Sequence, residues 1–226
     1  MARYRRAAAA AAVMLALAGC SRGAATAAAS APDPSYLLTQ AQKNAQAASA
    51  VHIRGTGSCP EGQFVVDMNL RADDTAAGSV TFQGATINVV ATKQQLLLNA
   101  PASFWTAQSS AKVAARIGQK WLRISRATNP CINALTSIPN VTANYFGYTG
   151  TPVLQKGSSF KGTPAAQVVV GTTVAYWIAT QGTLLPLNVY DSSNQTDIVL
   201  SGWNSNLSVV VPPDSDIIDA ASANKA

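Results

Sequence analysis

The most reactive side chains of this sequence are the thiols of three cysteines and the imidazole of one histidine. The first thiol, Cys20, ends the run Leu17-Ala18-Gly19-Cys20, which resembles a lipobox. In such a motif small residues let the signal peptidase approach the backbone, and the thiol receives a diacylglyceryl group before cleavage. We therefore predict lipidation at Cys20, with acyl chains such as palmitate.

The residues before Cys20 have the layout of a signal peptide. Arg3, Arg5 and Arg6 precede an uncharged, apolar run at 7–18. Crossing a bilayer as a helix takes about 20 apolar residues, so this run is too short to remain as a membrane span. We expect residues 1–19 to be a lipoprotein signal peptide, and the chain to be anchored by lipid on the extracytoplasmic face of the cell membrane. The alternative is an ordinary secretory peptide that carries a cysteine by chance.

The other two thiols, Cys59 and Cys131, are expected to form a disulfide, because exported chains fold in an oxidising compartment. A catalytic thiol or a metal site is the alternative. Both need helper residues, and the sequence has no CxxC or HxxxH spacing and only one histidine, His52. We therefore expect no metal and no cofactor.

Catalytic motifs are missing from the sequence. His52 is the only side chain that could act as a base at neutral pH without a large pKa shift, and no serine lies in a GxSxG motif. Gly55-Thr56-Gly57 lacks the lysine and the helix of a phosphate loop. We expect no catalytic residues and no enzyme activity, and His52 is expected to be a strand residue. Clustering of His52 with an aspartate in a cleft would favour an enzyme instead.

The charge of the chain argues against nucleic acid as a partner. Removing residues 1–19 leaves 13 of the 16 basic residues against 10 acidic ones, a net charge of about +3. These basic residues form no cluster in the sequence, and nucleic-acid-binding proteins usually have one. The remaining length is enough for one domain with a full core.

The first part of the remaining chain is expected to be a tether followed by a helix. Alanine, serine, glycine and threonine dominate from 21 to 31, so we expect a flexible tether over residues 20–33. Asp33-Pro34 is a helix-start signal. Leu38, Ala41 and Ala45 then recur at helical spacing, which predicts an amphipathic helix ending near residue 49.

After this helix the pattern changes to the two-residue period of strands. Phe64, Val66, Met68 and Leu70 alternate with polar neighbours. We expect a helix over 110–117, stopped by Gly118, and one or two helical turns within 129–148. Strands are expected over these segments: 51–53, 63–71, 80–83, 85–91, 96–100, 121–124, 167–170, 174–179, 184–190, 195–203 and 207–211.

Many short strands and few helices predict an α+β fold. A sheet with this many strands has to curl. We expect a strongly curved antiparallel sheet, a half-barrel, with two or three helices covering its concave side. One domain over 34–213 would contain it, and residues 214–226 are expected to be a disordered tail.

The order of these features resembles the LppX/LprG family of actinobacterial lipoproteins, whose fold is similar to that of the carrier LolA. Four segments carry the resemblance: the lipobox, 49–55, 118–122 and 179–187. The family implies a LolA-like half-barrel with an apolar cavity that holds the acyl chains of envelope lipids or lipoproteins. It implies no catalytic residue.

We therefore expect a membrane-anchored lipoprotein that binds or carries a lipid or an acylated envelope molecule. The alternative is a structural or sensor lipoprotein that contacts another envelope protein without a lipid ligand. The cavity would be lined from one face of the sheet, although the same side chains could form solid core. The proposed lining residues are Phe64, Val66, Met68, Phe82, Ile87 and Val89.

Overall fold

The computed structural model describes residues 32–155, 157 and 159–225. The expected signal peptide, the lipidation site Cys20 and the tether up to residue 31 lie outside the described residues. The α-helices are α1 (Pro34–Gln46), α2 (Ala102–Gln108), α3 (Ala111–Ile117), α4 (Pro130–Ala134), α5 (Ile138–Phe146) and α6 (Ala220–Ala223). Short 3-10 turns, η1 and η2, span Arg126–Thr128 and Asp214–Asp216.

The strands are β1 (Ala50–Cys59), β2 (Gly62–Arg71), β3 (Ala76–Phe82), β4 (Ala85–Ala91), β5 (Gln95–Asn99), β6 (Trp121–Ser125), β7 (Pro152–Gln155), β8 (Ser159–Phe160), β9 (Thr163–Val170), β10 (Val174–Ala179), β11 (Pro186–Asp191), β12 (Thr196–Ser201) and β13 (Ile217–Asp219). The predicted α+β class is confirmed. The described residues contain more helices than the two or three expected.

Two helix ends follow directly from their sequences. The Asp33 carboxylate accepts a hydrogen bond from the Ser35 N–H at 2.9 Å and caps α1, and Pro34 occupies the first turn. Gly118 has a φ of +57° at the end of α3, and its N–H donates to the Ala114 carbonyl. A residue with a Cβ adopts this conformation at a cost, so glycine is a natural stop for the helix.

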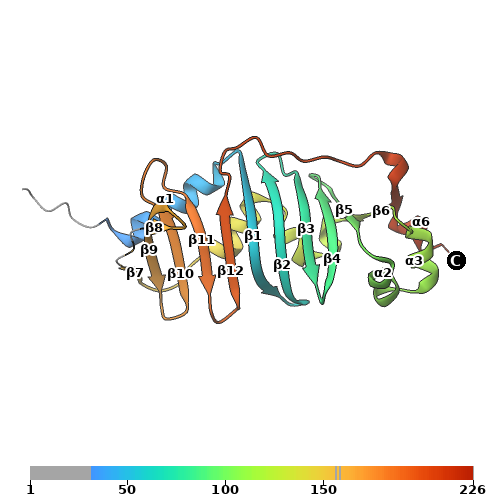
Figure 1. Ribbon diagram of the computed structural model, residues 1–226, viewed down its shortest axis with the longest axis horizontal. Helices are drawn as coiled ribbons and strands as arrows, with labels where there is room; N and C mark the ends of the chain where they lie inside the picture. The colour runs from blue at the N-terminus through green and yellow to red at the C-terminus, as the bar shows by residue number, and fades with distance from the viewer. Residues whose placement is uncertain (1–31, 156, 158, 226) are drawn as a thin grey trace, which may run out of the picture. The chain divides into compact units, whose positions relative to one another are not determined.

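The strands form one curved, open sheet in the order β13-β6-β5-β4-β3-β2-β1-β12-β11-β10-β9-β7, and β8 pairs with β9. All described pairs are antiparallel except β13 with β6. The early strands form a meander from β1 to β5, and β12 closes back onto β1 (Figure 1). Residues from both halves of the chain therefore meet at the centre of the sheet.

The two faces of the sheet differ in polarity. Along β2, Phe64, Val66, Met68 and Leu70 are buried, and the residues between them are exposed or half-buried. In Figure 1, α1 and the yellow segment with α4 and α5 lie behind the strands, so one face is covered by helices. We call this the helix face and the opposite one the open face. The core lies between the sheet and the helices.

Residues 214–223 correct the expectation of a disordered tail over 214–226. Ile217–Asp219 forms β13 beside β6, and Ala223 of α6 is buried. Arg123 on β6 contacts Asp214 at 3.1 Å and Asp219 at 3.3 Å, and so ties this segment to the sheet. The predicted strand over 207–211 is also wrong, because these residues join no sheet.

None of the helices within the described residues is long and apolar enough to cross a membrane.

Candidate ligand-binding site

The sheet brings the six proposed cavity residues together on the helix face. Phe64 pairs with Phe82 across β2 and β3, and Val66 pairs with Val80, which in turn pairs with Ile87. The rings of Phe64 and Phe82 meet edge to face with their centroids 6.0 Å apart. The two-residue period therefore placed these side chains on one face, as predicted.

These six residues differ in depth. Val66 and Val89 are 0% exposed and Met68 is 1% exposed, and all three lie in the packed core. Phe82 and Ile87 lie closer to the β3–β4 turn and line a hollow at the rim of the sheet. A role of Val66, Met68 and Val89 in holding a ligand stays a prediction.

The hollow at Phe82 and Ile87 lies between the β3–β4 hairpin, α2 and the residues that precede α4. Its volume is about 310 Å³, and we call it the α2 hollow. Its apolar lining includes Phe82, Ala85, Ile87, Phe104 and Ala107, and Glu61, Gln83, Gln108 and Asn129 supply polar groups. Ligand sites commonly combine mostly apolar walls with a few polar groups, at volumes of about 300–1,000 Å³.

A second hollow of about 470 Å³ lies on the other side of α4, and we call it the α5 hollow. It is lined by the β1–β2 hairpin, α4, α5 and the strands β10 to β12, with Tyr145, Tyr176, Val174 and Val189 among its residues. Burial raises the pKa of the Tyr145 and Tyr176 phenols to about 12, so both are neutral at ordinary pH.

Asp191 is one of two acidic residues that line the α5 hollow, the other being Glu61. Partial burial raises the pKa of this carboxyl, but hydrogen bonds from Ser193 and Asn194 outweigh burial and lower it overall. The hydroxyl of Ser193 donates at 2.6 Å, and the amide of Asn194 donates at 2.7 Å. Asp191 is therefore held as a carboxylate at the edge of the hollow.

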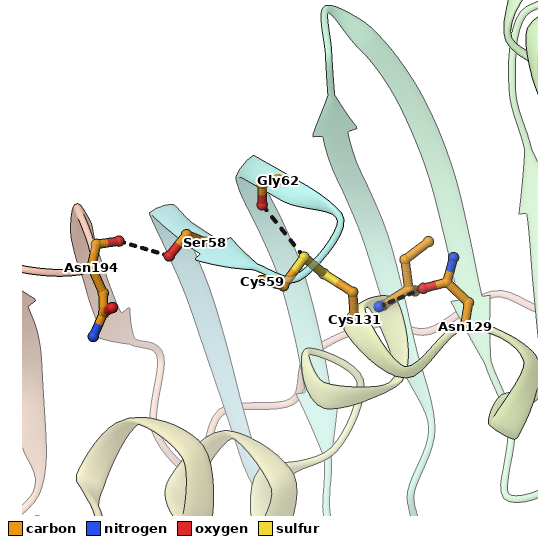
Figure 2. Close-up of a disulfide and its surroundings, with 7 residues drawn as sticks. Ser58, Cys59, Gly62, Asn129, Cys131 and Asn194 are labelled. Atoms are coloured by element: carbon orange, nitrogen blue, oxygen red, sulfur yellow. Dashed lines mark hydrogen bonds between the residues drawn. A yellow bond between two sulfur atoms is a disulfide. The ribbon is translucent and has the colours of Figure 1, made fainter.

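The predicted disulfide between Cys59 and Cys131 is present in the structure, with a Cα–Cα distance of 6.0 Å. It joins the tip of the β1–β2 hairpin to the first turn of α4 (Figure 2). Asn129 caps that turn by accepting the Ile132 N–H at 2.9 Å. Glu61 lies near both sulfur atoms, but these are bonded to each other and offer no thiolate to a metal.

His52 lies on the open face, between an aspartate and a serine. Its Nε2 lies 2.8 Å from Asp67 Oδ1, and its Nδ1 lies 3.3 Å from Ser201 Oγ. These are the residue types of a hydrolytic triad. The side chains of His52 and Asp67 are 30% and 50% exposed, however, and such a site depends on donors preorganised where water is excluded. The cluster fits a polar strand surface, as expected for His52.

Sequence reasoning missed the part of the site that α2, α5 and β10 supply. Phe104, Tyr145 and Tyr176 are aromatic residues that line the hollows, but their short segments carry no pattern that indicates which face they cover. The predicted pairing of Cys59 with Cys131 was the one signal that placed 130–134 beside the β1–β2 hairpin.

No protein-family model matches this sequence, and no curated protein matches it. Among solved structures, LprF from Mycobacterium bovis is similar, with 13% sequence identity, a TM-score of 0.53 and coverage of 80% of this chain and 99% of that one. An uncharacterized conserved protein from Thermus thermophilus shows 9% identity and a TM-score of 0.41, over 82% of this chain and 98% of that one. The fold of this chain is therefore that of LprF, which confirms the expected resemblance to the LppX/LprG lipoproteins at the level of the fold.

Proposed function

We propose that this protein is a membrane-anchored lipoprotein that binds or carries a lipid or an acylated envelope molecule. The observation that carries the proposal is the pair of rim hollows, one on each side of α4, that reach between the sheet and its helices. The LprF-like fold and the lipobox-like run ending at Cys20 support it.

The α2 hollow suits an acyl chain because its walls supply hydrocarbon contacts. Phe82 and Ile87 come from the sheet, and Phe104 comes from α2 on the other side. An acyl chain gains about 0.8 kcal/mol for each CH₂ group removed from water. Binding also costs several kcal/mol in lost freedom, so only long chains bind usefully.

The lipid on Cys20 would keep this domain at the outer face of the cell membrane, where its ligands are. Two acyl chains hold a protein at a bilayer far more firmly than one chain. The binding itself needs no covalent chemistry, no metal and no cofactor from the protein.

The proposal is tested by titrating the mature chain with fatty acids of graded length, using Cys20→Ser so that no lipid is attached. Affinity should rise about fourfold for each added CH₂ group until the hollow is full. Ala107→Trp should weaken binding, because Ala107 lines the α2 hollow and is exposed, so the larger ring need not disturb the core.

Ala77→Trp is the matched control, because Ala77 lies on β3 outside both hollows. Affinity that does not depend on chain length, in a folded protein, would contradict lipid binding. A structural or sensor role through contact with another envelope protein would then take its place.

A further inference from the structure

The open face of the sheet carries a groove that is separate from the α2 and α5 hollows. One part, of about 450 Å³, is lined from β1, β12 and the β8–β9 turn. The other part, of about 650 Å³, is lined from β1, β2, β3 and the turns at Gln83 and Gln195. Thr56 lines both parts, and we call them together the open-face groove. It crosses neighbouring strands in the order β12, β1, β2, β3, on the side of the sheet that faces the viewer in Figure 1.

Polar side chains line most of this groove. In the part that reaches β3, three of them are amides: Gln63, Gln83 and Gln195. In the part that reaches β12, they are charged groups and a hydroxyl: Arg54, Lys161, Asp197 and Ser201. Val65 adds an apolar patch and is 50% exposed. The lining therefore suits a ligand with many hydroxyl groups and little apolar surface, and not a hydrocarbon chain.

The charges of the groove balance. Arg54 Nε lies 3.6 Å from Asp67 Oδ2, and Lys161 lines the same part of the groove as Asp197. Two cations thus match two acids. Polyanions such as nucleic acid, and anionic membrane surfaces, bind where positive charge is in excess. The charge of the groove therefore fits an uncharged ligand.

Hydrogen bonds within the protein hold several of these groups in place. Asp197 Oδ1 accepts from Asn188 Nδ2 at 2.7 Å. His52 Nε2 lies 2.8 Å from Asp67 Oδ1, and its Nδ1 lies 3.3 Å from Ser201 Oγ. Side chains that are fixed before binding lose less conformational entropy when a ligand arrives. The part of the groove beside β12 is therefore preorganised for polar contacts.

Backbone strain also marks this groove. Five of the described residues other than glycine have a positive φ, and three of them line it: Gln83 at +48°, Lys161 at +48° and Gln195 at +51°. Gln83 and Lys161 each begin a two-residue hairpin turn, where asparagine, aspartate or glycine is preferred. Residues held in such conformations cluster at ligand sites. The chain thus keeps long polar side chains at the groove against the local preference of the turn.

We propose that the open-face groove binds an extended, uncharged glycan chain laid across β12, β1, β2 and β3. Sugar hydroxyls both donate and accept hydrogen bonds, which matches the amides, hydroxyls and balanced charges of the lining. Adjacent strands lie about 4.8 Å apart, close to the length that one hexose unit adds to an extended β-linked chain. Tyr190 pairs with Asp197 across β11 and β12 and is 47% exposed, so its ring can pack against the apolar face of a sugar beyond β12.

The test is calorimetric titration of the mature chain, carrying Cys20→Ser, with two series of soluble β-1,4-linked oligomers. One series is built of N-acetylglucosamine and the other of glucose. Affinity should rise with each added unit up to about four units, one for each strand crossed, and then stay constant. Failure of both series to bind the folded protein would overturn the inference.

Thr56→Trp tests the position of the site, because Thr56 is exposed and lies where the two parts of the groove meet. The ring should fill the groove and weaken binding of the tetramer at least about tenfold. Thr163→Trp is the matched control, because Thr163 is exposed on β9 and lines neither part. Equal affinities of the two variants would place the glycan elsewhere and overturn the inference.

Lys161→Asn replaces a strained lysine with a residue that its turn prefers. Tm should rise by about 2 °C because the strain is relieved. Affinity for the tetramer should nevertheless fall about threefold, because the ammonium group is lost from the groove. A higher Tm with unchanged affinity would overturn the assignment of Lys161 to the site.

Fatty-acid titration of the same variants separates this inference, which goes beyond the proposed function, from lipid binding. Thr56→Trp and Lys161→Asn should bind fatty acids as the wild type does, because neither residue lines the α2 or the α5 hollow. Glycan binding without fatty-acid binding would contradict only the proposed function. Fatty-acid binding without glycan binding would overturn only the inference about the open-face groove.

Discussion

The guanidinium of Arg126 donates a hydrogen bond from Nη1 to the carbonyl oxygen of Thr92 at 2.6 Å. The same group donates from Nε to the side chain of Asn133 at 2.7 Å and from Nη2 to the hydroxyl of Thr136 at 2.7 Å. Thr92 follows β4, and Asn133 belongs to α4. One side chain therefore fastens the helical segment to a turn of the sheet and fixes the position of α4 between the two hollows.

We predict that Arg126→Lys lowers the free energy of unfolding by about 2–4 kcal/mol, because an ammonium group cannot reach these acceptors together. Urea unfolding followed by circular dichroism measures the loss. Thr136 is fully buried, so replacing Arg126 also leaves a buried acceptor without its hydrogen bond. Arg54→Lys is the control: the Arg54 side chain is 75% exposed, and its replacement should change stability by less than about 0.5 kcal/mol. Equal effects of the two variants would contradict this role.

Reduction of the Cys59–Cys131 disulfide should lower the stability of the domain. The bond closes a loop of 72 residues, for which the chain-entropy model gives about 4 kcal/mol. Thermal unfolding with and without a reductant measures the difference, and the intact mass should increase by about two hydrogens on reduction. Thiols that label readily in the native protein without reductant would show that the bond is not formed.

Stability should fall at alkaline pH because of Tyr145 and Tyr176. Their pKa values are raised by burial to about 12, against 10.0 for a free phenol. The folded protein therefore holds these protons more firmly than the unfolded chain does. The contribution of these two protons to the free energy of unfolding is complete below pH 10 and is lost as the pH rises toward 12. In Tyr145→Phe the free energy of unfolding should fall less steeply between pH 10 and pH 12 than in the wild type. Urea unfolding at a series of pH values measures this slope. An unchanged slope would contradict burial of this phenol.

Cys20→Ala should release the protein from the membrane or leave it as an uncleaved precursor. The reason is that the diacylglyceryl group on Cys20 is the proposed anchor, and two acyl chains are needed for firm attachment. Membrane fractionation followed by immunoblotting measures the distribution. A variant that is processed normally and remains fully membrane-bound would rule out lipidation at this cysteine.

The sequence predicted the sheet well where alternation was strong. In β2, four apolar residues at alternate positions face the helices, and the pattern left little freedom of register because a shift by one residue would expose all of them. Asp33 and Gly118 were also predicted as helix boundaries, because capping depends on the residue at the helix end itself. The pairing of Cys59 with Cys131 was predicted because they are the two cysteines that remain besides Cys20, and exported chains fold in an oxidising compartment.

Local sequence patterns did not predict the segments whose conformation depends on tertiary contacts. The apolar run 207–211 has a strand-like composition, yet it passes the sheet without pairing, and its Leu207 carbonyl accepts a bond from Arg71 at 3.3 Å. β13 was missed because three residues make a strand only when β6 offers a free edge. The sequence also did not indicate how deeply each residue lies in the core. Val66 and Ile87 lie on the same face of the sheet, but of the two only Ile87 lines the α2 hollow.

The most direct test of lipid binding is mass spectrometry of the lipids that copurify, without covalent attachment, with the wild-type protein extracted from its own cell envelope. We predict a bound lipid with long acyl chains, enriched over its share of the envelope, and loss of this lipid from the folded Ala107→Trp variant. Recovery of a folded wild-type protein with no bound lipid, together with no uptake of acyl chains in titration, would contradict lipid binding by this protein.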